Sequence, residues 1–153
     1  MSQSRSAMTD IPPKNTRERR RWGPIAVIAG VTYFTIGVVF GALAGSSGST
    51  LGLKAWRWAA FALSMVVFLV HVRFDYQRFR NALTTARHVA IGVALGGFLL
   101  AAMATARATL VEGTPRRLLV ALIAWPLLTG VPAFVVAWIL ATMLARLGHD
   151  QPV

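Results

Sequence analysis

Four long apolar runs separated by short polar segments dominate the chain. A helix needs about 20 predominantly apolar residues to cross the hydrocarbon core of a bilayer. The second run is shorter than this unless Arg57 extends its guanidinium toward the head groups. The pattern predicts an all-α, polytopic membrane protein that folds as a four-transmembrane-helix bundle. We expect the spans at about residues 23–44, 56–73, 88–106 and 118–145.

The segments outside these runs predict a simple domain organisation. Residues 1–21 are polar and basic, with too few apolar side chains to bury a core, so we expect a disordered tail. The membrane domain then covers residues 22–146. Residues 147–153 form a short C-terminal tail.

The distribution of basic residues predicts the orientation, because cytoplasmic loops carry an excess of Lys and Arg. With the N-terminus inside, eleven of the 16 Lys and Arg residues lie on the cytoplasmic side of the four-span model. The N-terminal tail and the polar segment between the second and third spans supply most of these residues. We therefore expect both termini in the cytoplasm.

Composition supports the membrane assignment and excludes several functions. Hydrophobic residues make up 56% of the chain and charged residues only 14%, which departs strongly from a soluble domain. The net charge of +11 comes from residues that flank spans, so we do not expect nucleic-acid binding. The absence of cysteine excludes disulfides and thiolate sites. Abundant Ala and Arg without Cys indicates a bacterial inner membrane.

The first run also resembles a cleavable export signal. Three arginines precede it, and an A-x-A pattern ends at Ala44. The run is longer than the apolar core of a usual signal, so we expect it to remain as a span. Cleavage would place the mature N-terminus at Gly45 and would remove the four-span model.

Small residues recur at helical spacing in three of the runs. Helices in lipid associate through close packing, which small side chains permit. We expect these stripes to pack within the chain, and the alternative is a homodimer or a docking surface for another subunit. The stripe residues are Gly37, Gly41, Gly45, Gly92, Gly96, Ala133, Ala137 and Ala141.

Few residues offer catalytic chemistry. The chain has five carboxylates, and all fall outside the predicted spans, so a proton-coupled transporter has no membrane carboxylate to titrate. Motifs of intramembrane proteases are absent from the sequence. We therefore expect no catalytic residues and no enzymatic activity. The carboxylates are Asp10, Glu18, Asp75, Glu112 and Asp150.

Residues 69–89 concentrate polar side chains between the second and third runs. His71 and Asp75 are four residues apart and would share a helix face. We interpret the stretch as a basic interfacial helix end in which Asp75 pairs with a nearby arginine. The alternatives are haem b bound by His71 and His88, or a divalent metal held by the two histidines and Asp75. We predict no cofactor.

Basic side chains beside the membrane are expected to contact anionic head groups. The predicted head-group residues are Arg19, Arg20, Arg21, Arg73, Arg78 and Arg80.

The fourth run contains two helix-breaking residues, Pro126 and Pro132, with Gly130 between them. We expect a kink there, with Thr129 able to bond the carbonyls that the prolines leave without donors. Broken helices also form substrate sites in transporters, which is the alternative interpretation.

These observations favour a non-catalytic accessory or assembly subunit of a membrane complex. Its partners would be the anionic bilayer and other membrane subunits or a second copy of the chain. The alternatives are a small transporter, channel or holin-type pore former, and a haem- or metal-binding membrane protein.

Overall fold

The computed structural model describes residues 15–112 and 116–147, and the side chains of residues 23–109 and 120–147. The described part contains four helices, each with a stretch long and apolar enough to cross a membrane. This confirms the all-helical fold and is consistent with an integral, multi-pass membrane protein. The helices are α1 (Asn15–Ser46), α2 (Thr50–Phe79), α3 (Ala82–Glu112) and α4 (Arg116–Leu147).

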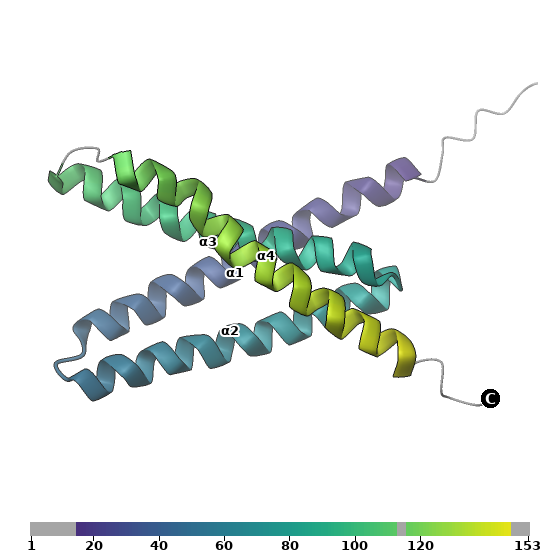
Figure 1. The fold of residues 1–153 in the computed structure, drawn as a ribbon, viewed down its shortest axis with the longest axis horizontal. Coiled ribbons are helices and arrows are strands. Elements are labelled where there is room, and N and C mark those ends of the chain that lie inside the picture. The colour runs from purple at the N-terminus through teal and green to yellow at the C-terminus, as the bar shows by residue number, and fades with distance from the viewer. Residues whose placement is uncertain (1–14, 113–115, 148–153) are drawn as a thin grey trace, which may run out of the picture.

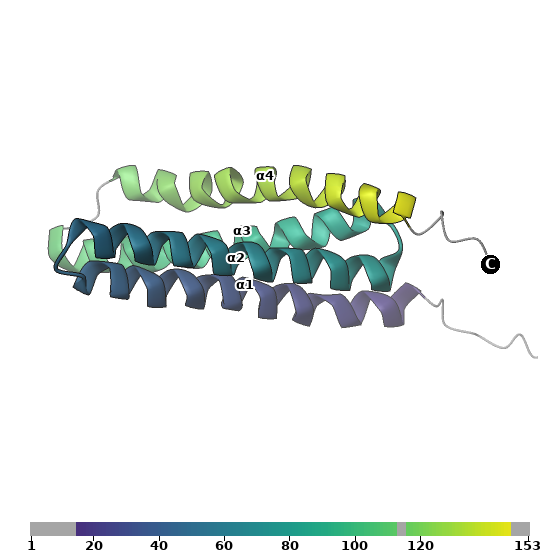
Figure 2. The ribbon, with the colours of Figure 1, turned by 90° about the horizontal axis from the view of Figure 1, so that it is seen from below.

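The helices form two antiparallel hairpins that cross, α1 with α2 and α3 with α4 (Figure 1). Helix α3 contacts all three other helices, whereas α1 and α4 share no contact in the described part of the chain. Seen from the side, α4 lies above α3 and α1 lies on the opposite side (Figure 2). Helix α3 is therefore the centre of the fold.

One end of the bundle collects three segments of the chain. The first turn of α1, the connection between α2 and α3, and the last turn of α4 all lie at the same end of the long axis (Figures 1 and 2). We call this the terminal end. The connection between α1 and α2 lies at the opposite end (Figure 2).

The helices extend further than the predicted spans. Helix α1 begins at Asn15, before the predicted boundary at Trp22. The polar segment expected between the second and third spans is helical except for Arg80 and Asn81. Arg80 has φ 47° and caps α2 with its N–H, which donates to the Tyr76 carbonyl at 2.9 Å.

Helix α3 starts immediately after this turn because Asn81 caps it. The Asn81 side-chain oxygen accepts from the Thr84 N–H at 3.0 Å. Ser49 caps α2 in the same way through the Gly52 N–H at 3.1 Å. The predicted tails, residues 1–14 and 148–153 in particular, lie outside the described residues.

Helix α4 runs without interruption through Pro126 and Pro132. The expectation for Thr129 is corrected: its hydroxyl donates to the carbonyls of Trp125 at 3.0 Å and Pro126 at 3.3 Å. Each proline removes the donor of the carbonyl four residues before it. The Thr129 hydroxyl bonds neither of those carbonyls. The kink itself stays a prediction.

Close helix contacts form at several of the expected small residues. A Cβ at Gly96 would lie 2.7 Å from the Tyr33 Cβ and 3.1 Å from the Gly30 carbonyl oxygen. A Cβ at Gly37 would lie 2.7 Å from a methyl group of Leu100. At Gly96 a side chain would force the neighbouring helix to shift, whereas at Gly37 the Leu100 side chain would have to move.

The alanine stripe of α4 faces the interior. Ala133 is almost fully buried, and Ala137 and Ala141 are completely buried. The main core cluster joins α2, α3 and α4 toward the terminal end. Its buried members are Phe68, Val72, Ala86, Val89, Ala133 and Ala137.

Candidate functional site

A polar cluster is buried where α2 and α3 meet, near the terminal end. His71 and Asp75 lie one turn apart on α2, as their spacing predicts, and His71 Nε2 is 3.5 Å from Asp75 Oδ2. His88 of α3 faces the same oxygen, with its Nδ1 at 4.0 Å. One carboxylate oxygen therefore faces two imidazoles from two helices.

Burial makes this cluster unusual. Asp75 is 1% exposed, His71 7% and Thr85 of α3 0%. The carboxylate oxygens of Asp75, both ring nitrogens of His71 and the Thr85 hydroxyl have no hydrogen-bond partner among the described residues. The separation of 3.5 Å is longer than a good N–H···O bond, so the pair attracts without satisfying its polar atoms.

Apolar and aromatic groups enclose the two histidines. The His71 ring packs against Gly92 of α3, where a Cβ would lie 3.1 Å from its Cε1 and 3.3 Å from the Ala29 Cβ of α1. Phe79, the last residue of α2, packs edge-on against His88 with ring centroids 4.6 Å apart. Gly92 therefore creates the space that His71 occupies.

The structure corrects the expected partner of Asp75. Its ion-pair contacts within the described residues are to the two histidines, not to an arginine. Arg73, Arg78 and Arg80 are exposed on the outside of the helices. Arg78 instead lies over the Phe79 ring, with 5.8 Å between its Cζ and the ring centroid.

Helical geometry turns Arg73 away from the cluster, whereas Arg78 lies one turn after Asp75 on the same face of α2. The Arg78 side chain is nevertheless exposed. The side chains of Arg19, Arg20 and Arg21 lie outside those that the structure describes. Head-group contacts of all six arginines stay a prediction.

The metal alternative is not supported by the geometry. Among the described residues, no group of three His, Asp or Glu side chains is arranged to hold a metal ion. Haem binding by His71 and His88 stays a prediction. Each ring faces the Asp75 carboxylate with one nitrogen, His71 with Nε2 and His88 with Nδ1.

The position of Asp75 also changes one inference from the sequence. We expected no carboxylate within a span, but Asp75 lies inside the continuous apolar helix α2 and is buried in the bundle. The candidate span of the structure thus includes a buried carboxylate that the predicted span, which ends at Arg73, left outside.

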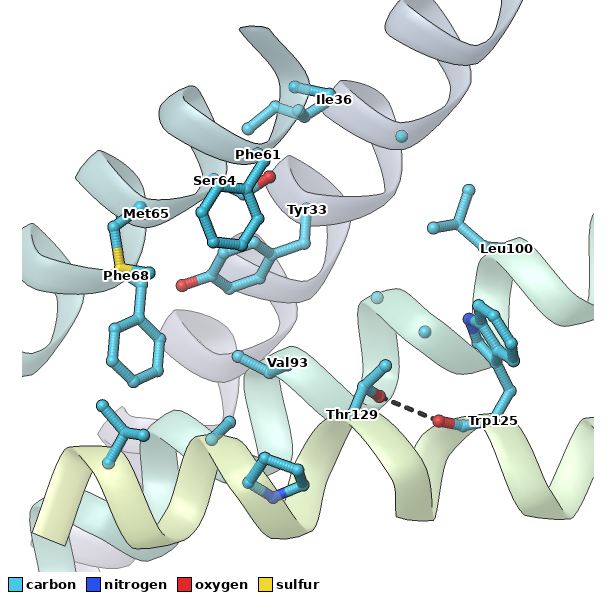
Figure 3. A pocket seen from close by; sticks show the side chains of 17 residues that line it. Tyr33, Ile36, Phe61, Ser64, Met65, Phe68, Val93, Leu100, Trp125 and Thr129 are labelled. Carbon is cyan, nitrogen blue, oxygen red and sulfur yellow. Dashed lines mark hydrogen bonds between the residues drawn. The ribbon is translucent and has the colours of Figure 1, made fainter. Parts of the chain in front are cut away.

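A second feature is an apolar crevice of about 390 Å³ between the two hairpins. All four helices contribute to its wall, and Figure 3 shows side chains of α1, α2 and α4 directed into it. Two of the lining residues, Tyr33 and Ser64, carry hydroxyl groups. The remaining large side chains in the wall are Ile36, Phe61, Met65, Phe68, Leu100 and Trp125.

Tyr33 was not among the residues expected to form a site. Its hydroxyl is buried in the crevice wall and has no hydrogen-bond partner among the described residues. The crevice arises from the crossing of the two hairpins, which no local sequence pattern reveals. The only available signal was a tyrosine in the middle of an apolar run.

A third feature is the open half of the α1 glycine stripe. Gly37 is filled by Leu100 of α3, but nothing lies within 4 Å of a Cβ built at Gly41 or Gly45. Packing within the chain therefore covers one glycine of this stripe and leaves two uncovered.

Three further glycines in helix contacts were not singled out as packing residues. A Cβ at Gly30 would lie 2.8 Å from Leu95, and one at Gly97 would lie 2.6 Å from the Thr129 hydroxyl. Gly130, expected only to weaken the helix, packs against Ala94, with 3.0 Å between the two Cβ positions.

Comparison with known proteins finds no family model, no curated protein and no solved structure that matches this chain.

Proposed function

We propose that the protein is a non-catalytic accessory or assembly subunit of a complex in the bacterial inner membrane. The proposal includes four spans and cytoplasmic termini, which place the terminal end and its arginines beside the inner head groups. Docking would occur through the uncovered part of α1. The single observation that carries this proposal is the contrast between Gly37 and the pair formed by Gly41 and Gly45.

The part of α1 that α3 covers illustrates how a partner helix would pack on the uncovered part. Leu95 and Leu100 of α3 insert against Gly30 and Gly37, so that the helices approach closely. Helix α3 does not reach the next two glycines along the stripe. A partner helix that carries a large apolar side chain would complete the contact by the same packing.

Co-purification in mild detergent tests this role. The wild-type chain should bring down a stoichiometric membrane partner, and Gly41→Leu with Gly45→Leu should abolish its recovery. Val39→Leu is the matched control, because Val39 is exposed and lies on the side of α1 opposite to Gly41. Loss of the partner in the control as well, or recovery from all three chains, would contradict docking at these glycines.

Buried Asp75 favours a second candidate, a small proton-coupled transporter. Its carboxylate faces two histidines inside the bundle, where a proton-binding group can serve a transport step. In liposomes with an internal pH dye, the wild-type chain should carry protons under a membrane potential. Asp75→Asn should abolish that flux, and equal fluxes in the two chains would reject this candidate.

A further inference from the structure

The crevice between the hairpins lies at the middle of all four helices. The apolar segments of the helices are 23–46, 50–79, 82–109 and 120–147, and their midpoints fall beside or at residues of the crevice wall. Those residues are Tyr33, Ser64, Gly96 and Ala133. At 1.5 Å per residue, Tyr33 lies about 15 Å from the nearer end of its segment, which is half the hydrocarbon thickness. The crevice is therefore at the bilayer midplane.

The crevice is open at its side. Phe61 and Met65 line it and are also exposed, so the wall continues onto the surface of the bundle. In a membrane that surface meets hydrocarbon. A molecule dissolved in the bilayer can thus enter without crossing the protein, and a site of about 390 Å³ falls within the usual range for small-molecule pockets.

Tyr33 specifies the chemistry of the occupant. Tyr33 lines the crevice, its hydroxyl is buried without a partner among the described residues, and Figure 3 shows the side chain reaching from α1 toward α2. Thr129 uses its hydroxyl on the Trp125 carbonyl. An unpaired donor in hydrocarbon carries a free-energy cost that a ligand acceptor would remove.

The depth of the crevice in the bilayer limits which lipid-soluble molecules can bring an acceptor group to Tyr33. The ester and phosphate oxygens of a phospholipid lie at the interface, about 15 Å from the midplane. A helix of another protein has its backbone carbonyls already bonded. A quinone carries its carbonyl acceptors on a ring that dissolves in the hydrocarbon core.

The wall also suits a flat ring. Phe61, Phe68 and Trp125 provide aromatic faces and edges, and Met65 provides a polarisable thioether. Ser64 brings a second hydroxyl from α2. We propose that this crevice binds the ring of a prenyl quinone, with one carbonyl accepting from Tyr33 and the isoprenoid tail leaving sideways into the bilayer.

Binding is tested with the full chain in nanodiscs of quinone-free phosphatidylcholine. A decyl benzoquinone is added as the probe, and quenching of tryptophan fluorescence is followed, because Trp125 lies in the wall. A saturable component is expected. Decanol at the same concentration should not compete, whereas equal competition would mean that any apolar tail fills the crevice and would overturn the proposal.

Two variants locate the site. Tyr33→Phe removes only the hydroxyl and should weaken binding roughly tenfold, the loss expected for one buried hydrogen bond. Ala60→Phe places a ring in the crevice and should abolish the saturable component. Ala62→Phe, which lies on the exposed face of the same helix, is the matched control and should bind as the wild type does.

Several results would overturn the inference. Absence of saturable quenching in the wild type would do so, as would unchanged affinity in both Tyr33→Phe and Ala60→Phe. Efficient disulfide cross-linking between two copies of Ala60→Cys would assign the crevice to a second chain instead. Partner capture through Gly41 and Gly45 is a separate measurement, so each proposal can fail without the other.

Discussion

His71 Nε2 lies 3.5 Å from Asp75 Oδ2, one helical turn away, and both side chains are buried where α2 meets α3. The contact is an ion pair when the imidazole carries its second proton, and a contact between a carboxylate and an uncharged ring when it does not. Helix α3 completes it, since His88 Nδ1 faces the same oxygen at 4.0 Å. The polar cluster therefore joins two helices through one carboxylate.

We expect His71 and Asp75 to be energetically coupled. Removing one partner leaves the other buried without compensation, so His71→Ala and Asp75→Ala should show a coupling of about 0.5–3 kcal/mol in a double-mutant cycle. Unfolding of the purified chain in mixed micelles supplies the free energies. The corresponding cycle for His88 and Asp75 should give a smaller value, and additive effects in both cycles would contradict the role of this cluster.

Gly96 should tolerate no side chain. Gly96→Ala places a methyl group 2.7 Å from the Tyr33 Cβ and 3.1 Å from a backbone oxygen, so α1 and α3 must separate. We expect a loss of about 1–3 kcal/mol. Gly41→Ala is the control, because its Cβ meets nothing within 4 Å. Thermal unfolding in detergent compares the two, and similar midpoints would show that the close contact is absent.

Arg80 occupies a backbone conformation that favours glycine. Its φ of 47° lies in the left-handed region, where a Cβ is unfavourable. Arg80→Gly should therefore stabilise the chain by about 1 kcal/mol. Arg73→Gly, at an exposed position inside α2, should destabilise it by about the same amount. Thermal midpoints of the two variants should shift in opposite directions.

The absence of cysteine permits a direct test of orientation. Single-cysteine variants Ser47→Cys and Asn81→Cys place a thiol at opposite ends of the bundle. In intact cells an impermeant maleimide should label Ser47→Cys but not Asn81→Cys, and lysis should expose the second. The reverse pattern would place the terminal end outside the cytoplasm.

The type and the number of the helices could be predicted from the sequence, because uncharged apolar runs of this length form membrane-spanning helices. The helix boundaries could not be predicted in the same way. Arg73 and His88 were taken as the edges of the second and third spans, yet α2 and α3 continue to a turn formed by Arg80 and Asn81. Charge marks the edge of the hydrocarbon, whereas capping by Asn81 marks the start of a helix.

The candidate sites were predicted only in part. Helical spacing correctly placed His71 and Asp75 on one face, but the approach of His88 to the same oxygen depends on how α2 packs on α3. The expected arginine partner of Asp75 was wrong, because that packing buries Asp75 and leaves Arg78 exposed. The crevice at Tyr33 depends on the crossing of two hairpins, a relation between residues far apart in the chain.

The central position of α3 has a consequence for biogenesis. Helix α4 packs chiefly on α3 and shares no contact with α1 in the described part of the chain. While the ribosome has released only the first hairpin, the surface that receives the last helix does not yet exist. The order of synthesis thus matches the order in which docking surfaces become available, so that each new helix can settle as soon as it enters the bilayer.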